Sequence, residues 1–96
     1  MNNSKNLILL FIVDGCEACK IAENLINKAI KQSNRTDVTL EVTNITDIHN
    51  DFTGIVKNYL INDCPTIVFE KNGKYIKTFV GTTTVYNIVN MINDCF

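Results

Sequence analysis

The chain has 96 residues, of which 46% are hydrophobic and 20% are charged, a composition typical of globular proteins and unlike that of disordered or collagen-like chains. Its 9 Lys+Arg and 10 Asp+Glu give a net charge of −1, and the basic residues are scattered. This distribution lacks both the basic face that binds nucleic acid and the Lys/Arg cluster that binds an anionic membrane surface. A chain of this length is expected to form a single domain, residues 1–96, with one hydrophobic core.

An apolar run over residues 7–13 follows Lys5 and has some features of a secretory signal. The run is short for such a signal, and Asp14 stands where small neutral residues should lead to a cleavage site. Its seven residues are also too few to span a bilayer. We therefore interpret the run as a buried strand and expect a cytoplasmic protein that does not enter a membrane.

The first half of the chain predicts two strands and two helices. The continuous apolar run over residues 6–13 is typical of a strand covered on both faces. Apolar residues at helical spacing then predict an amphipathic helix from about residue 16 to residue 33. Apolar residues alternate with polar ones in a predicted half-buried strand over residues 38–43, and helical spacing returns over residues 45–60. The apolar positions of the first helix and the following strand are Ile21, Ala22, Leu25, Ile26, Ala29, Ile30, Val38, Leu40 and Val42.

The second half predicts a hairpin and a last helix. Residues 66–70 and 75–80 form the two strands, and Asn72-Gly73 between them suits a type I′ turn. Gly81 ends the hairpin, and a run of three threonines caps a helix that begins near Val85. The order β-α-β-α-β-β-α predicts an α/β fold, with a four-stranded mixed sheet flanked by helices on both faces.

Two of the four cysteines stand three residues apart, directly after the first strand and at the start of the first helix. This spacing places the Cβ atoms of Cys16 and Cys19 about 5–6 Å apart, so a small local adjustment closes a disulfide. A loop this small gains little stability from chain entropy, which suits a bond that is made and broken. Because a helix N-terminus favours the thiolate, Cys16 is the predicted nucleophile and Cys19 the resolving thiol.

Charged residues beside the cysteines act in both directions on the thiolate. Lys20 favours it, whereas Asp14 and Glu17 oppose it. The spacing of Asp14 and Glu17 also fits a capping box, which is a purely structural interpretation of both acids.

The cysteines have a metal-binding alternative. Zinc sites of the ribbon type use two Cys-x-x-Cys pairs, whereas Cys64 and Cys95 are 31 positions apart. A metal or iron–sulfur module built from Cys16, Cys19 and Cys64 is a second hypothesis. A redox-silent interaction domain is a third, and the intact Cys-x-x-Cys pair argues against it.

Nearly the whole chain resembles the thioredoxin–glutaredoxin superfamily. The resemblance rests on the apolar strand, Cys16-Glu17-Ala18-Cys19-Lys20, Asp63-Cys64-Pro65-Thr66 and the stretch from Ile67 to Gly81. It implies a thioredoxin-like fold and a dithiol–disulfide oxidoreductase that needs no bound cofactor or metal, reduces protein disulfides and cycles through a Cys16–Cys19 disulfide. It also implies that Pro65 is a cis-proline beside the dithiol and that Cys64, Pro65, Gly81 and Lys20 support substrate binding.

The sequence departs from the superfamily pattern at several positions. Gly15 replaces an aromatic residue of thioredoxins, and Leu10 replaces their buried acid. Glu17-Ala18 replaces the glutaredoxin Pro-Tyr, and threonines follow Gly81 where glutaredoxins have residues for glutathione. The departures favour a protein disulfide as substrate and leave a glutathione-dependent glutaredoxin as an alternative. The electron donor, a reductase or glutathione, is left open.

Cys64 has three interpretations: a small apolar filler, a third redox thiol that exchanges with Cys16, or a ligand in a three-sulfur metal site. We predict that Cys64 modulates Cys16 without being required for turnover.

Overall fold

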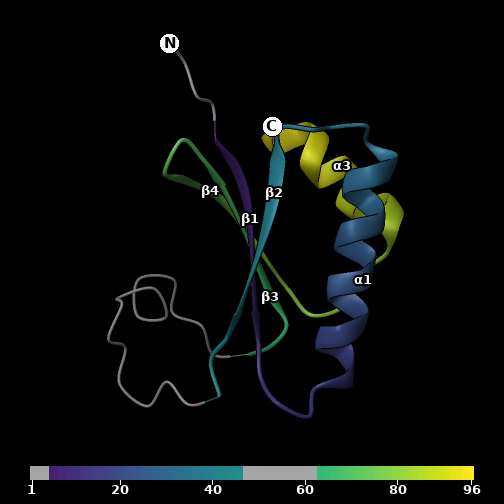
Figure 1. The fold of residues 1–96 in the computed structure, drawn as a ribbon, viewed down its shortest axis with the longest axis vertical. Helices are drawn as coiled ribbons and strands as arrows, with labels where there is room; N and C mark the ends of the chain where they lie inside the picture. Colours follow the sequence, from purple (N-terminus) through teal and green to yellow (C-terminus); the bar gives the residue numbers. More distant parts are fainter. Residues whose placement is uncertain (1–4, 47–62) are drawn as a thin grey trace.

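The computed structural model describes residues 5–46 and 63–96 (Figure 1). Within these residues the strands are β1 (Asn6–Ile12), β2 (Val38–Asn44), β3 (Thr66–Lys71) and β4 (Lys74–Val80), and the helices are α1 (Glu17–Gln32) and α3 (Val85–Cys95). Each of these elements lies within about two residues of its predicted bounds. The helix predicted over residues 45–60 falls, except for its first two positions, outside the described residues.

The four described strands form one mixed sheet in the order β2-β1-β3-β4. β1 is parallel to β2 and antiparallel to β3, and β4 is antiparallel to β3. The predicted four-stranded mixed sheet is therefore confirmed.

The main hydrophobic core lies between one face of the sheet and the two described helices, α1 and α3, which pack against each other (Figure 1). From β1, Ile8 and Leu10 enter this core, and both are fully buried. On the opposite face, Leu9 and Phe11 of the same strand are buried with Val68 of β3. Successive side chains of β1 are thus buried on alternate faces, which confirms a strand covered on both sides.

Two apolar positions predicted to be buried are exposed. Ile21 of α1 is 48% exposed, because at 100° per residue it lies about 140° around the helix from Ile26, which is fully buried. Val42 is 39% exposed and belongs to β2, an edge strand of the sheet. Hydrophobic spacing identified these elements correctly and overestimated the width of their buried faces.

The turn and cap chemistry expected in the second half of the chain is present. Asn72 and Gly73 have φ values of 54° and 80°, and two positive φ angles are what a type I′ turn requires. Asn72 also ties the hairpin to the start of β1, since its Oδ1 accepts a hydrogen bond from the backbone N–H of Lys5 at 2.8 Å. At the start of α3 the Thr84 hydroxyl accepts a hydrogen bond from the N–H of Asn87 at 3.1 Å, so Thr84 is the predicted N-cap.

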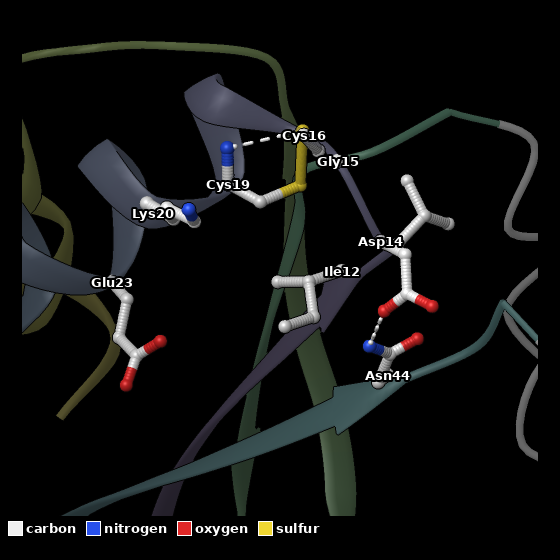
Figure 2. Close-up of a pocket in the computed structure, with 9 residues that line it drawn as sticks. Ile12, Asp14, Gly15, Cys16, Cys19, Lys20, Glu23 and Asn44 are labelled. Atoms are coloured by element: carbon white, nitrogen blue, oxygen red, sulfur yellow. Dashed lines mark hydrogen bonds between the residues drawn. A yellow bond between two sulfur atoms is a disulfide. The ribbon is translucent and has the colours of Figure 1, made fainter.

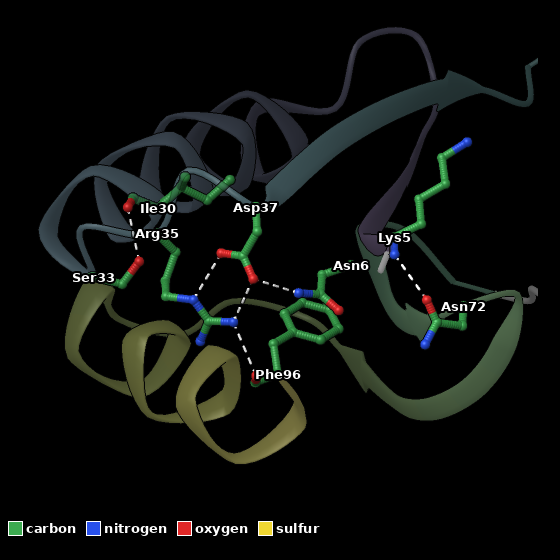
Figure 3. A network of polar contacts seen from close by, with 8 residues as sticks. All are labelled: Lys5, Asn6, Ile30, Ser33, Arg35, Asp37, Asn72 and Phe96. Carbon is green, nitrogen blue, oxygen red and sulfur yellow. Dashed lines mark hydrogen bonds and ion pairs between the residues drawn. The ribbon is translucent and has the colours of Figure 1, made fainter. Parts of the chain in front are cut away.

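A polar network joins the end of the α1–β2 connection to α3 and β1 (Figure 3). The Arg35 guanidinium donates two hydrogen bonds to the Asp37 carboxylate, at 2.8 and 2.7 Å, and one to the backbone oxygen of Phe96 at 2.9 Å. The side-chain amide of Asn6 donates to the same carboxylate at 2.7 Å. The hydrogen bonds from Arg35 lower the pKa of Asp37 from 3.8 to about 2.

Candidate redox site

The loops that carry the predicted site residues gather at one edge of the sheet. β1 and β2 both end there, because Ile12 is paired with Asn44. β3 begins and β4 ends at the same edge, because Thr66 is paired with both Phe11 and Val80. The loops that follow β1, precede β3 and follow β4 carry Cys16, Pro65 and Gly81, respectively.

Cys16 and Cys19 are joined by a disulfide at the N-terminus of α1, with their Cα atoms 5.2 Å apart (Figure 2). Cys16 is the N-cap of the helix and has an extended backbone conformation. Its sulfur accepts a hydrogen bond from the backbone N–H of Cys19 at 3.1 Å. The same N–H group and the positive end of the helix would stabilise negative charge on Cys16 in the reduced protein.

The two sulfur-bearing residues differ in exposure. Cys19 is 2% exposed and belongs to the buried side of α1, whereas Cys16 is only partly buried. Cys16 is therefore the more accessible of the two residues.

The capping-box interpretation of Asp14 and Glu17 is wrong. The N-cap is Cys16, and Glu17 is the first residue of α1. The Asp14 carboxylate instead accepts a hydrogen bond from the Asn44 side-chain amide at 2.7 Å, and the Asp14 N–H donates to the Thr46 hydroxyl at 2.6 Å. The loop before Cys16 is thus attached to the end of β2.

A pocket of about 210 Å³ adjoins the disulfide (Figure 2). Of the predicted site residues, Cys16, Cys19 and Lys20 line it. The ends of β1 and β2 and the next turn of α1 contribute other lining residues, among them Ile12, Asp14, Glu23 and Asn44. The pocket therefore combines the disulfide with one basic and two acidic side chains.

The predicted site residues Cys64, Pro65 and Gly81 form a neighbouring structure that does not line this pocket. The Cys64–Pro65 peptide bond is cis, and the Pro65 carbonyl accepts a hydrogen bond from the Gly81 N–H at 2.9 Å. Gly81 has a φ of 99°, a conformation that favours glycine. On the other side of the bend, the Thr66 hydroxyl donates to the Asp63 carbonyl.

The Cys64 side chain packs against the buried cluster of Leu9, Phe11 and Val68. Burial, and to a lesser degree the charge of Asp63, raises the pKa of Cys64. Both effects favour the neutral thiol, which agrees with the interpretation of Cys64 as a small apolar filler.

The geometry offers no ligand set for a metal in the described residues. Within 5–46 and 63–96, no three His, Cys, Asp or Glu side chains gather closely enough to hold an ion. Cys95 lies in the main core, where burial raises the pKa of its thiol. The arrangement therefore gives the metal-module hypothesis no support.

None of the helices described here is long and apolar enough to cross a membrane.

Asn44 and Thr46 are site residues that the sequence reasoning missed. Their place could have been inferred from the predicted parallel strands, because the carboxyl ends of neighbouring parallel strands meet at the same edge of a sheet. The residues that follow β2 could therefore have been placed beside the loop that follows β1.

Comparisons with known proteins agree with this geometry. The family model Thioredoxin matches residues 1–94. Among solved structures, thioredoxin-2 of the malaria parasite, described as a component of the protein secretion machinery, superposes with a TM-score of 0.77 at 16% identity, covering 95% of this chain and 84% of that chain. Mitochondrial thioredoxin 3 of Saccharomyces cerevisiae has a TM-score of 0.73 at 22% identity, with 94% and 78% covered.

A third similar structure is the germline-specific thioredoxin Deadhead of Drosophila melanogaster, with a TM-score of 0.72 at 20% identity, covering 96% of this chain and 82% of that chain. No curated protein matches the chain significantly in sequence. At these identities the structural likeness establishes the fold, and the predicted thioredoxin-like architecture is confirmed.

Proposed function

The chain belongs to the thioredoxin family, and on that premise we propose that it is a thiol–disulfide oxidoreductase that reduces disulfides of protein substrates. The observation that carries the proposal is the Cys16–Cys19 disulfide at the N-terminus of α1, with Cys16 reachable and Cys19 buried. A reactive sulfur at the surface and a second sulfur beneath it are what a two-step exchange requires.

In the first step, the Cys16 thiolate of the reduced protein attacks one sulfur of a substrate disulfide. A new bond forms between Cys16 and that sulfur, the substrate disulfide breaks, and the other substrate sulfur leaves as a thiolate. The backbone N–H of Cys19, 3.1 Å from the Cys16 sulfur in the oxidised form, stabilises the attacking thiolate. Lys20, which follows in the first turn of α1, favours the same charge.

In the second step, Cys19 resolves the mixed disulfide. Its sulfur attacks that of Cys16, the bond to the substrate breaks, and the second substrate sulfur leaves and takes up a proton. The substrate gains two electrons and the Cys16–Cys19 disulfide forms. The Cα separation of 5.2 Å lies within the range of ordinary disulfides.

In many thioredoxins a buried acidic side chain assists the deprotonation of the resolving cysteine. Cys19 has no such acid at the corresponding position. That position is Leu10, which is fully buried in the main core. The substrate thiolate released in the first step is a base that the reaction itself supplies for the Cys19 proton, and the second substrate sulfur takes its proton from solvent as it leaves.

The loop around the cis peptide bond is the proposed support for the substrate chain. The Gly81 N–H already donates to the Pro65 carbonyl, so that donor is not available to a substrate. Backbone contacts with an extended substrate segment must therefore come from other groups of this loop. Cys64, packed against the apolar cluster, is assigned a supporting role beside Pro65.

A reducing compartment such as the cytoplasm is the proposed setting, because a dithiol that donates electrons must itself be kept reduced. A flavin-containing reductase is the proposed electron donor. The alternative donor is glutathione, which a glutaredoxin would use, and the experiment below distinguishes these two donors.

The experiment is reduction of insulin, with thioredoxin reductase and NADPH in one series and glutathione in the other. We expect insulin to precipitate faster with the protein and the reductase than with the reductase alone. The Cys16→Ser/Cys19→Ser variant, which lacks both sulfurs, is the matched control. A rate equal to that control with both reductants would refute the proposed activity, and activity with glutathione alone would assign the glutaredoxin type.

A further inference from the structure

Asn44, at the end of β2, uses both ends of its side-chain carboxamide. Its Nδ2 donates to the Asp14 carboxylate at 2.7 Å, and its Oδ1 accepts from the N–H of Thr46 at 2.9 Å. Because a carboxamide has a distinct donor end and acceptor end, these two bonds fix its orientation. The amide hydrogens therefore face the β1–α1 loop.

Asp14 is held at its backbone as well as at its side chain. Its N–H donates to the Thr46 hydroxyl at 2.6 Å, and the next residue, Gly15, turns the chain with a φ of 72°. The Asp14 carboxylate points toward Asn44, whereas Cys16 lies beyond Gly15 on the other side (Figure 2). The residues after β2 thus set both where Asp14 sits and which way its charge points.

The charges around Cys16 make this orientation matter. In the described residues the charged groups near the start of α1 are Asp14 in the preceding loop and Glu17, Lys20 and Glu23 on the helix, and Asp63 precedes the cis-proline loop. Acidic side chains outnumber the single basic one, and each carboxylate that approaches Cys16 disfavours its thiolate. Asp14 is exposed, so without its partner the carboxylate is free to rotate.

We propose that Asn44 is a positioning residue that holds the Asp14 carboxylate away from Cys16 and so keeps the Cys16 thiolate reactive. The inference rests on the proposed function, since it concerns the reactivity of the attacking sulfur. A carboxylate that moves from a distant position to about 6 Å from that sulfur, at a dielectric constant close to that of water, lowers the thiolate fraction by at most about threefold at a pH where the thiol predominates.

The test measures the reactivity of Cys16 itself. In a reduced Cys19→Ser background, the rate of alkylation of Cys16 by iodoacetamide is followed by mass spectrometry across pH. Asn44→Ala is expected to slow the reaction by up to about threefold at about pH 6 and to move the rate profile to higher pH. Asn44→Asp, which places a second carboxylate opposite Asp14, is expected to act in the same direction, so a misfolded alanine variant would not prevent the test.

The decisive arm is Asp14→Asn, which keeps an acceptor for Asn44 and removes the charge. In that background Asn44→Ala should leave the alkylation rate unchanged. Asn72→Gly is the matched control. It removes a carboxamide that accepts a hydrogen bond from the backbone N–H of Lys5 at the opposite end of β1, and glycine tolerates the positive φ of this position. We expect this control to react like the parent protein.

An equal slowing by Asn44→Ala with and without the Asp14 charge would overturn the inference and leave Asn44 a structural residue. No slowing by either Asn44 variant would overturn it as well. Because alkylation needs neither a substrate protein nor an electron donor, failure of the insulin assay would count against the proposed function and not against this inference.

Discussion

Reduction of the Cys16–Cys19 disulfide is expected to lower the free energy of unfolding by only about 2 kcal/mol. The sequence separation of 3 means that the bond closes a loop of four residues, from position 16 to position 19. In the chain-entropy model such a loop removes about 6 cal/mol/K from the unfolded state, which is about 2 kcal/mol at 25 °C. A loop of about 100 residues would give about 4.7 kcal/mol by the same relation.

Urea unfolding of the oxidised and reduced protein measures this difference. With a denaturant slope of about 1.5 kcal/mol/M, the midpoint should fall by about 1.3 M on reduction. The Cys16→Ser/Cys19→Ser variant should show no change on adding reductant, which would exclude an effect at Cys64 or Cys95. A loss above about 4 kcal/mol, or unfolding of the reduced protein in the absence of urea, would mean that the disulfide is required for the stability of the fold and would refute the reasoning.

The remaining predictions concern the core, the polar network and the third cysteine. Ile26→Ala should lower the free energy of unfolding by about 3 kcal/mol and Ile21→Ala by less than about 1 kcal/mol, because of these two residues only Ile26 is fully buried. Equal losses for the two variants in urea unfolding would contradict the packing described for α1. Arg35 holds the pKa of Asp37 at about 2, so this carboxylate adds stability above its unfolded pKa that is lost as the pH falls from about 4 to about 2. Asp37→Asn should therefore flatten the acid limb of the stability curve, and an unchanged limb would disprove the coupling. Cys64→Ala should keep insulin reduction within about tenfold of the parent rate, and a folded but inactive variant would give Cys64 a part in the chemistry.

The fold was predictable to the extent that local patterns determine it. A continuous apolar run identified β1, and Asn72-Gly73 identified the hairpin because that pair accepts two positive φ angles. The disulfide could be anticipated from the spacing of Cys16 and Cys19 at a strand–helix junction.

The parts of the site that escaped prediction depend on contacts between segments distant in sequence. Asp14 and Glu17 have the spacing of a capping box, and nothing in that spacing shows that Asn44, 30 residues away, binds the Asp14 carboxylate instead. The exposure of Ile21 escaped for a similar reason. Helical spacing shows which side chains share a face, and the neighbouring elements decide how wide a face is covered.

Trapping of a mixed disulfide tests the central claim most directly, namely that Cys16 attacks and Cys19 resolves. Reduced Cys19→Ser and Cys16→Ser variants are each mixed with a protein disulfide substrate, and covalent complexes are resolved without reductant and mapped by mass spectrometry. The account predicts a stable complex through Cys16 in the Cys19→Ser variant and none through Cys19 in the other, because Cys16 is accessible and Cys19 is 2% exposed. Trapping through Cys19, or through Cys64 in both variants, would contradict it.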